Sequence, residues 1–208
     1  KWIVSYYAIA RAGAVINPVN TMLTPDEIRY VINDCGATAI IASDDKVEAV
    51  RNVLDLVTAS FVFGDEQGEN IRSFDELLEH DAPPLPKIDI TSDALSTICY
   101  TSGTTGHPKG AMQSHRSVIL NGALTAQMHM RGPSDVVVSA LPCPHVYANV
   151  VMQSMMLYGC KLVLHKRFDA NAMLTDMQAH RATIMDGVPT MYMYLLNEEN
   201  LSDYDLSS

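Results

Sequence analysis

Residues 95–110, LSTICYTSGTTGHPKG, join an apolar run to a loop that is rich in glycine and hydroxyl groups and leads to Lys109. The apolar run predicts a buried strand at 95–101. Glycines in the loop allow positive φ and let a ligand approach the backbone closely, and successive amide groups in such a turn can bind an anion. The loop therefore suits phosphate oxygens, although the same residue types also build ordinary surface turns.

Helices and strands alternate along the rest of the chain. The predicted helices span 2–12, 25–35, 44–57, 74–80, 115–130, 146–157, 170–180 and a last segment from Pro189. The predicted strands span 14–20, 37–43, 60–64, 95–101, 135–140, 161–166 and 182–187. Strands separated by helices require crossovers, which place helices over both faces of a parallel sheet. The predicted fold class is therefore α/β, with largely parallel sheets flanked by helices.

The best internal boundary is the segment 81–93, DAPPLPKIDITSD, which carries three prolines and little periodicity. We predict a partial α/β subdomain at 1–80, a linker at 81–93, and a second partial subdomain with the phosphate loop at 94–208. The chain starts inside a predicted helix and without an initiator Met, so we expect it to be a piece of a longer protein.

The net charge and the spacing of the cysteines limit the classes of partner and the cellular location that we expect for this protein. The net charge is −10 and no basic run is present, which argues against nucleic acid or an anionic membrane as a partner. No apolar segment approaches the length of a membrane span. The four cysteines are widely spaced and form no CxxC pair, as is typical of reduced thiols in a cytosolic protein. We therefore expect a cytoplasmic location.

Several conspicuous side chains have a simple structural interpretation. His107 and His115 flank the lysine but lack the spacing of metal ligands, and no metal site is predicted within the chain. His165 and His180 are expected to be exposed. The helical spacing of three methionines predicts core positions: Met152, Met155 and Met156.

The glycine-rich loop is not the P-loop of ordinary NTPases. That motif places Gly-Lys-Ser/Thr five residues after its first glycine, whereas here Pro108 is five residues after Gly103 and Lys109 precedes Gly110. TSGTTGHPKG at 101–110 instead resembles the phosphate-binding signature of the adenylate-forming (AMP-binding) superfamily. That superfamily includes acyl-CoA synthetases, aryl-CoA ligases and the adenylation domains of peptide synthetases.

Three other segments resemble the same family in the same order along the chain. They are RAGAVINPVNTMLTPDEIRYVINDCGA at 11–37, ALPCPHVYANV at 140–150 and GVPTMY at 187–192. The resemblance implies part of the large N-terminal domain of an acyl-CoA synthetase-like fold. It also implies the reaction, in which a carboxylate attacks ATP to give an acyl-adenylate and pyrophosphate, and coenzyme A then takes the acyl group. ATP, Mg²⁺ and coenzyme A are thus the implied co-substrates and cofactor of the parent enzyme.

The resemblance assigns the loop to the β- and γ-phosphates of ATP. The implied phosphate-binding residues are Thr101, Ser102, Gly103, Thr104, Thr105, Gly106 and Lys109. Thr104 and Thr105 are expected to contact phosphate, and Lys109 to neutralise charge as a catalytic residue. Such a clamp suits the chemistry, because charge builds up on the departing pyrophosphate and fixed donors with Mg²⁺ stabilise it.

The resemblance also assigns an acyl site. His145 matches the family histidine beside the reacting carboxylate, and Gly187, Val188 and Pro189 match a segment that lines the acyl pocket. By position alone, His145 is a helix cap or core residue and 187–189 is a strand-to-helix turn with proline at the first helical position. Pro144 replaces a common aromatic and Cys143 a common aliphatic residue, so we expect an unusually shaped pocket.

Residues around His145 bear on the class of acid. Peptide-synthetase domains place an Asp near this position to pair with the ammonium group of an amino acid, whereas 143–152 contains no Asp or Glu. A buried ammonium without a counter-charge is costly. The expected substrate is a fatty or an aromatic carboxylic acid, and the sequence leaves both open.

The family motifs that would follow the phosphate loop are not in these 208 residues: the Tyr-Gly-x-Thr-Glu segment that helps to hold Mg²⁺, the ribose-binding Asp and the catalytic Lys. We therefore expect the isolated chain not to complete catalysis, and to self-associate through exposed apolar edges. Two alternatives remain: a non-catalytic nucleotide- or acyl-binding module, and a structural scaffold in which the loop has no role.

Overall fold

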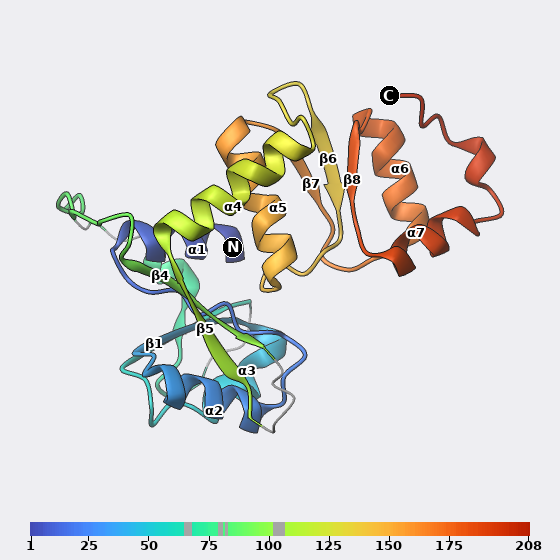
Figure 1. The fold of residues 1–208 in the computed structure, drawn as a ribbon. Coiled ribbons are helices and arrows are strands. Elements are labelled where there is room, and N and C mark those ends of the chain that lie inside the picture. Colours follow the sequence, from blue (N-terminus) through green and yellow to red (C-terminus); the bar gives the residue numbers. More distant parts are fainter. Residues whose placement is uncertain (65–67, 79–80, 82, 102–106) are drawn as a thin grey trace. The chain divides into compact units, whose positions relative to one another are not determined.

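The computed structural model describes residues 1–64, 68–78, 81, 83–101 and 107–208 (Figure 1). These residues form two compact units, Lys1–His115 and Arg116–Ser208. The predicted linker at 81–93 lies inside the first unit, and its described residues form neither helix nor strand. The compact units divide after His115, not at the predicted linker. The subdomain boundary at 81–93 remains a prediction.

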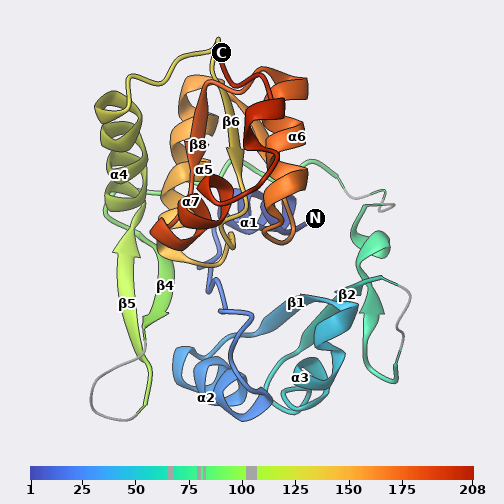
Figure 2. The same cartoon turned by 90° about the vertical axis from the view of Figure 1, so that its right-hand side faces the viewer.

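The first unit contains a parallel sheet, a hairpin and their connecting helices. Its elements are α1 (Trp2–Arg11), α2 (Pro25–Cys35), β1 (Ala39–Ser43), η1 (Asp44–Lys46), α3 (Val47–Arg51), β2 (Ala59–Phe63), β3 (Arg72–Ser73), η2 (Phe74–Leu77), β4 (Leu95–Thr101) and β5 (Lys109–Ser114). The parallel sheet has the order β1-β2-β3. Ile28 of α2 and Ala49 of α3 pack in one cluster with the half-buried Ile40 of β1 (Figure 2).

The second unit is a three-stranded parallel sheet covered by helices. Its elements are α4 (His115–Met128, which starts at the last residue of the first unit), β6 (Val136–Ser139), α5 (Val146–Tyr158), β7 (Lys161–Leu164), α6 (Ala170–His180), β8 (Ile184–Asp186), α7 (Pro189–Leu196) and η3 (Leu201–Asp203). The strand order is β7-β6-β8, and both pairings are parallel.

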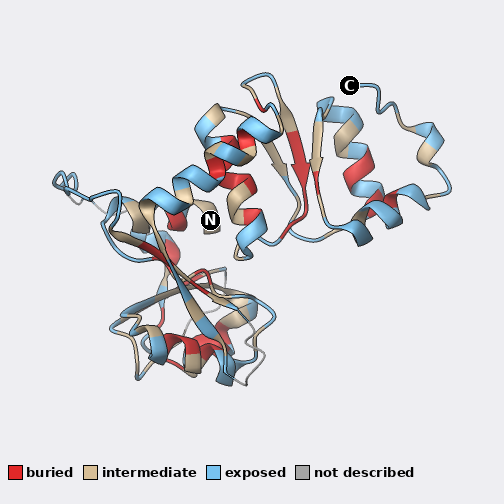
Figure 3. Ribbon diagram, viewed as in Figure 1, coloured by how far each residue is buried: buried red, intermediate tan, exposed pale blue. Residues whose placement is uncertain are grey.

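The central strand β6 shows why this sheet is covered on both faces. Successive side chains of a strand point to opposite faces. Val137 packs in a cluster with Val151 and Met155 of α5, whereas Val138 packs with Met173 of α6 and Leu195 of α7. Both valines are fully buried, and the buried residues concentrate on β6 and on the helix faces turned toward it (Figure 3). The predicted α/β class, with parallel sheets flanked by helices, is confirmed.

Local signals fix the helix ends as predicted. The Thr24 side chain accepts from the Glu27 amide at 3.3 Å, and the Glu27 carboxylate accepts from the Thr24 amide at 2.8 Å. Pro25 occupies the first turn, and Gly36 ends the helix with φ of 62°, a conformation that glycine adopts without strain. A second capping box, at Ser73, opens the helix predicted from Phe74, which is a 3-10 helix rather than an α-helix.

Three predicted elements differ in the structure. The strand predicted at 14–20 is reduced to a single bridge between Ile16 and Thr97. The helix predicted at 44–57 ends at Arg51 and begins as a 3-10 turn. Strand β5, at 109–114, was not among the predicted strands, because its sequence KGAMQS does not alternate in polarity and contains a glycine. It pairs antiparallel with β4, so the sheets are not all parallel.

Two predictions about single side chains are wrong. Met156 is 54% exposed, whereas Met152 and Met155 are buried as predicted, because one residue further along the helix turns the side chain away from the sheet. The His165 side chain is only 13% exposed, and its Nε2 atom lies 3.0 Å from an Asp176 carboxylate oxygen on α6. In the described part of the chain, no helix is long and apolar enough to cross a membrane.

Candidate active site

The predicted phosphate loop leaves β4 and returns in β5. The two strands are in register, with Thr101 opposite Lys109 and Tyr100 opposite Gly110. Directly opposite residues of an antiparallel pair lie on the same face, and both Thr101 and Lys109 are exposed. The first hydroxyl group of the motif and its lysine therefore share one face at the base of the loop. The other predicted phosphate-binding residues, Ser102, Gly103, Thr104, Thr105 and Gly106, lie outside the described residues.

Both ends of the loop contact helix α2. The Tyr100 hydroxyl donates to an Asp34 carboxylate oxygen at 2.5 Å, and burial, together with this neighbouring carboxylate, raises the pKa of Tyr100. The His107 ring stacks on Tyr30 with 4.7 Å between ring centroids. Tyr100 and His107, which precede and follow residues 102–106, are thus held by side chains from the last two turns of α2. His107, for which the sequence suggested no function, has a structural role here.

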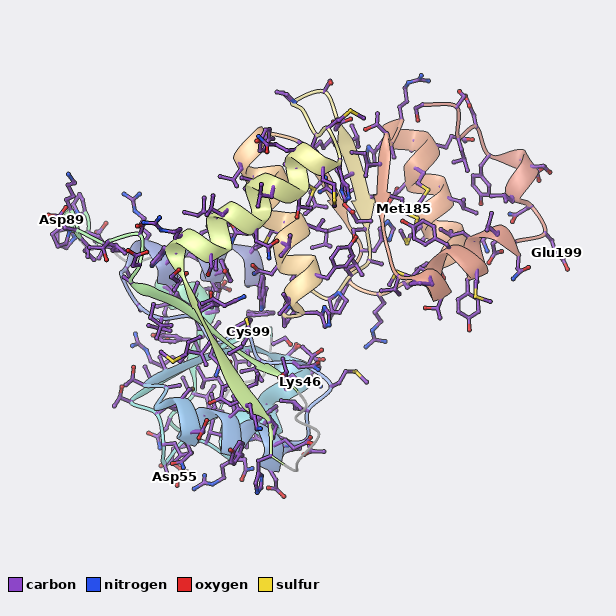
Figure 4. All side chains as sticks on the ribbon, in the orientation of Figure 1. Lys46, Asp55, Asp89, Cys99, Met185 and Glu199 are labelled. Atoms are coloured by element: carbon purple, nitrogen blue, oxygen red, sulfur yellow. The ribbon has the colours of Figure 1, made fainter. Side chains whose placement is uncertain are left out.

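Gly110 allows the Tyr100 side chain to lie across β5. A Cβ atom at Gly110 would lie 2.8 Å from Cγ2 of Ile98 and 3.1 Å from Cζ of Tyr100. Contacts this short force a neighbour to move. The glycine after Lys109 therefore supports the contact between Tyr100 and α2. Cys99, labelled in Figure 4, precedes Tyr100 on β4 and is buried.

His145, the predicted pocket histidine, is the N-cap of α5. Its Nδ1 atom accepts from the Tyr147 amide at 3.3 Å, and the imidazole is exposed. An Nδ1 atom that accepts a hydrogen bond carries no proton, so the neutral ring has its proton on Nε2. The cap interpretation is confirmed, and it leaves the Nε2–H group available as a donor.

Gly187, Val188 and Pro189 form the predicted turn from β8 into α7. Val188 is the N-cap and Pro189 takes the first helical position, where its missing amide proton costs nothing. Val188 and Pro189 are exposed. Met185, labelled in Figure 4, lies two residues before this turn. Its carbonyl accepts from the Tyr192 hydroxyl at 2.9 Å.

Sequence reasoning missed a buried ion pair next to this turn. Arg131 Nη2 donates to both carboxylate oxygens of Asp186, at 2.8 and 2.6 Å. The two side chains are 0% and 4% exposed. One signal was available: Asp186 is a charged residue in an otherwise apolar strand, ATIMDG, and such residues are rarely buried unless they are paired.

Among the described residues, no group of three His, Cys, Asp or Glu side chains is placed to hold a metal ion. Cys35, Cys99, Cys143 and Cys160 are all free thiols.

Comparison with known proteins identifies the family. The family described as AMP-binding enzyme matches residues 1–208. The chain belongs to the AMP-binding enzyme family. The predicted resemblance to adenylate-forming enzymes is therefore confirmed.

This AMP-binding chain resembles several CoA ligases. It is 33% identical to 4-coumarate–CoA ligase 5 of Oryza sativa subsp. japonica, in a match that covers 100% of this chain and 39% of that protein. It is 28% identical to a long-chain-fatty-acid–CoA ligase of Bacillus subtilis (strain 168), with 99% and 42% covered. The structure of ATP-bound MatB from Rhodopseudomonas palustris matches with a TM-score of 0.83 and 30% identity, over 96% of this chain and 39% of that one.

The AMP-binding chain spans about two fifths of the length of these relatives. The fold of this chain corresponds to the matched part of the solved CoA-ligase structures.

Proposed function

We propose that the full-length protein containing this chain is an AMP-forming acid–CoA ligase. It activates a carboxylic acid with ATP as an acyl-adenylate and then transfers the acyl group to coenzyme A. The observation that carries this proposal is the β4–β5 hairpin of a chain of the AMP-binding family: it sets Thr101 opposite Lys109, and we assign the segment between them to phosphate binding. The names of the relatives, which are CoA ligases, support the same reaction class.

In this proposal the loop binds the departing pyrophosphate. The loop residues Thr101–Gly106 donate hydrogen bonds to the β- and γ-phosphates, and Lys109 neutralises the charge that develops there. Preorganised donors and cations are usually the largest contribution to such a step. Mg²⁺ typically binds through substrate phosphates with one or two carboxylates, and the described residues offer no three-ligand cluster of their own. When bound with ATP, the ion supplies further charge neutralisation.

His145 and the 187–189 turn form the acyl side of the proposal. The cap bond places the proton of the neutral His145 ring on Nε2. We assign that Nε2–H group to the substrate carboxylate, which it orients as a hydrogen-bond donor. Gly187, Val188 and Pro189 line the acyl pocket, and two of them are exposed and available for contact.

The proposed acid is aromatic or fatty. Residues 143–152 provide no carboxylate for a substrate ammonium group. Asp186 does lie at the end of β8, but Arg131 already neutralises its charge. An amino-acid substrate would therefore lack a counter-charge among these groups, which is costly in a buried pocket. Aromatic and fatty acids also appear in the names of the relatives.

The test is ATP–pyrophosphate exchange by the full-length protein with a panel of aromatic, fatty and amino acids. Exchange with an aromatic or fatty acid is expected, and Lys109→Ala should lower its rate by roughly 10²-fold. Lys87→Ala, at an exposed lysine outside helices and strands, is the matched control and should leave the rate unchanged. A panel with no active acid would refute the reaction class, and full activity of Lys109→Ala would refute the role of that lysine.

The alternative is a non-catalytic nucleotide- or acyl-binding module. Calorimetry with ATP and Mg²⁺ separates the two, because binding without exchange for any acid favours the module. Unchanged ATP binding in both Thr104→Ala and Lys109→Ala would instead indicate a loop without a ligand role. A cytoplasmic location and self-association of the isolated chain belong to the same proposal; exposed apolar side chains on α4, such as Ile119 and Leu124, support the latter.

A further inference from the structure

A buried ion pair joins three elements of the second unit. Arg131 lies just beyond the end of α4, and Asp186 is the last residue of β8. The same guanidinium group donates from Nη1 to Ser154 Oγ of α5 at 2.8 Å. Its Nη2 atom also lies 2.9 Å from Nδ1 of His129. Removing two charges from water is costly unless their remaining hydrogen-bonding groups are satisfied, and these contacts satisfy most of them.

The backbone of Asp186 is held as well as its side chain. Ser139 Oγ, at the end of the neighbouring strand β6, donates to the Asp186 carbonyl at 2.9 Å. The same hydroxyl accepts from the Leu141 amide at 3.2 Å. The end of β8 is therefore tied to the end of β6 and to the start of the segment that leads to His145.

The pair lies next to both segments that the proposed function assigns to the acyl site. Asp186 immediately precedes the turn 187–189. Burial and then the Asp186 charge raise the pKa of the Tyr147 hydroxyl, and the Tyr147 amide donates to the capping Nδ1 atom of His145. The Arg131 side chain contacts Ser154 of α5 and Asp186 of β8 together, so it can hold the two segments in one relative geometry, because directional hydrogen bonds specify position better than apolar contacts do.

We propose that Arg131 and Asp186 are positioning residues for the acyl site, holding the first turn of α5, with His145 and Tyr147, in register with the turn Gly187–Pro189. This inference rests on the proposed function, since it assigns both segments to substrate. The pair does not contact the reacting atoms. Its role is to fix the groups that do so, and loss of the pair is expected to weaken the use of the acid more than the use of ATP.

The first experiment needs no catalysis. A single 3-fluorotyrosine at position 147 of the full-length protein is titrated by ¹⁹F NMR, in the otherwise unchanged protein and in Asp186→Asn. Burial and then the Asp186 charge raise the pKa of Tyr147, so the label should titrate at lower pH when the charge is removed. An identical titration in both proteins would overturn the inference, because Asp186 would then not act on Tyr147.

The second experiment separates positioning from stability. Arg131→Met/Asp186→Leu replaces the pair with apolar side chains of similar size, which in buried ion pairs restores stability. The expected result is a folded enzyme with near-normal KM for ATP and a KM for the acid raised roughly tenfold or more, because misplaced binding groups cost rate and affinity. Arg29→Gln/Asp55→Asn removes an exposed pair with the same 2.6 Å separation and should leave both KM values unchanged.

The outcomes are distinguishable. An unchanged KM for the acid in the folded double variant makes the pair merely structural and overturns the inference. A wild-type protein that activates no acid refutes the proposed function and with it the assignment of an acyl site to these segments. In that case a shifted ¹⁹F titration would show only that Asp186 acts on Tyr147, whereas the shift together with a raised KM for the acid supports the inference.

Discussion

Removal of Arg131 should destabilise the second unit far more than removal of a surface charge. Arg131→Met leaves the Asp186 carboxylate buried, since that side chain is 4% exposed and solvent cannot replace the lost partner. Breaking a buried pair in this way costs about 3–5 kcal/mol. That is a large part of a total stability of roughly 5–15 kcal/mol. By contrast, Arg131→Met/Asp186→Leu leaves no uncompensated charge and should recover most of the loss.

Urea unfolding followed by far-UV circular dichroism measures this difference. With a slope near 2 kcal/mol per molar urea, the midpoint of Arg131→Met should fall by about 1.5–2.5 M. Arg29→Gln is the control: its partner Asp55 is 63% exposed, so the loss should stay below about 1 kcal/mol, or roughly 0.5 M. A midpoint for Arg131→Met no lower than that of the control would refute the reasoning, as would a double variant as unstable as the single one.

Three further predictions concern the loop hairpin, a pH-dependent contact and a helix start. Gly110→Val should displace the Tyr100 ring and lower the free energy of unfolding by about 1–3 kcal/mol. Quenching of Tyr100 fluorescence equal to that of wild type would contradict the displacement of the ring. The Asp135 carboxylate accepts from the Thr183 hydroxyl at 2.7 Å, and this hydrogen bond lowers the pKa of Asp135. The ionised carboxylate therefore stabilises the fold above about pH 4, and this contribution is lost as the pH falls through the lowered pKa. Asp135→Asn should therefore be less stable than wild type at pH 7, by about 1 kcal/mol, with the gap closing at low pH; a gap independent of pH in thermal melts would argue against it. Thr24→Ala removes a capping box and should cost about 0.5–2 kcal/mol, whereas Thr24→Ser should be nearly neutral; equal melting temperatures for Ala and Ser would refute the cap.

The helices were predictable because their signals are local. The box at Thr24, Gly36 beyond the last turn and Pro189 at a first turn each act within one turn of chain, and each occurs where expected. The cap at His145 follows from the same kind of signal. The order of strands and helices, and with it the α/β class, follows from hydrophobic periodicity that can be read in short windows.

The candidate site was predictable only as far as its motif reaches. Thr101, Lys109 and His145 were identified from their segments, and the structure adds that Thr101 and Lys109 share one face of a hairpin. That pairing was not foreseen, because β5 shows no alternation and pairs through its backbone. The contact of His107 with Tyr30 was equally hidden, since the two rings come from segments far apart in the chain.

The sequence by itself determined the capped start of α2, the alternation of elements and the phosphate-loop motif, because each depends on residues within a few positions of one another. Only the tertiary structure decided which charged groups are paired and buried. Arg131 and Asp186 are 55 residues apart, and although the apolar strand around Asp186 indicates that it needs a partner, nothing local to either residue names the other. They become a buried pair because the parallel sheet brings the end of β8 beside the end of α4, where water is excluded and each charge requires the other.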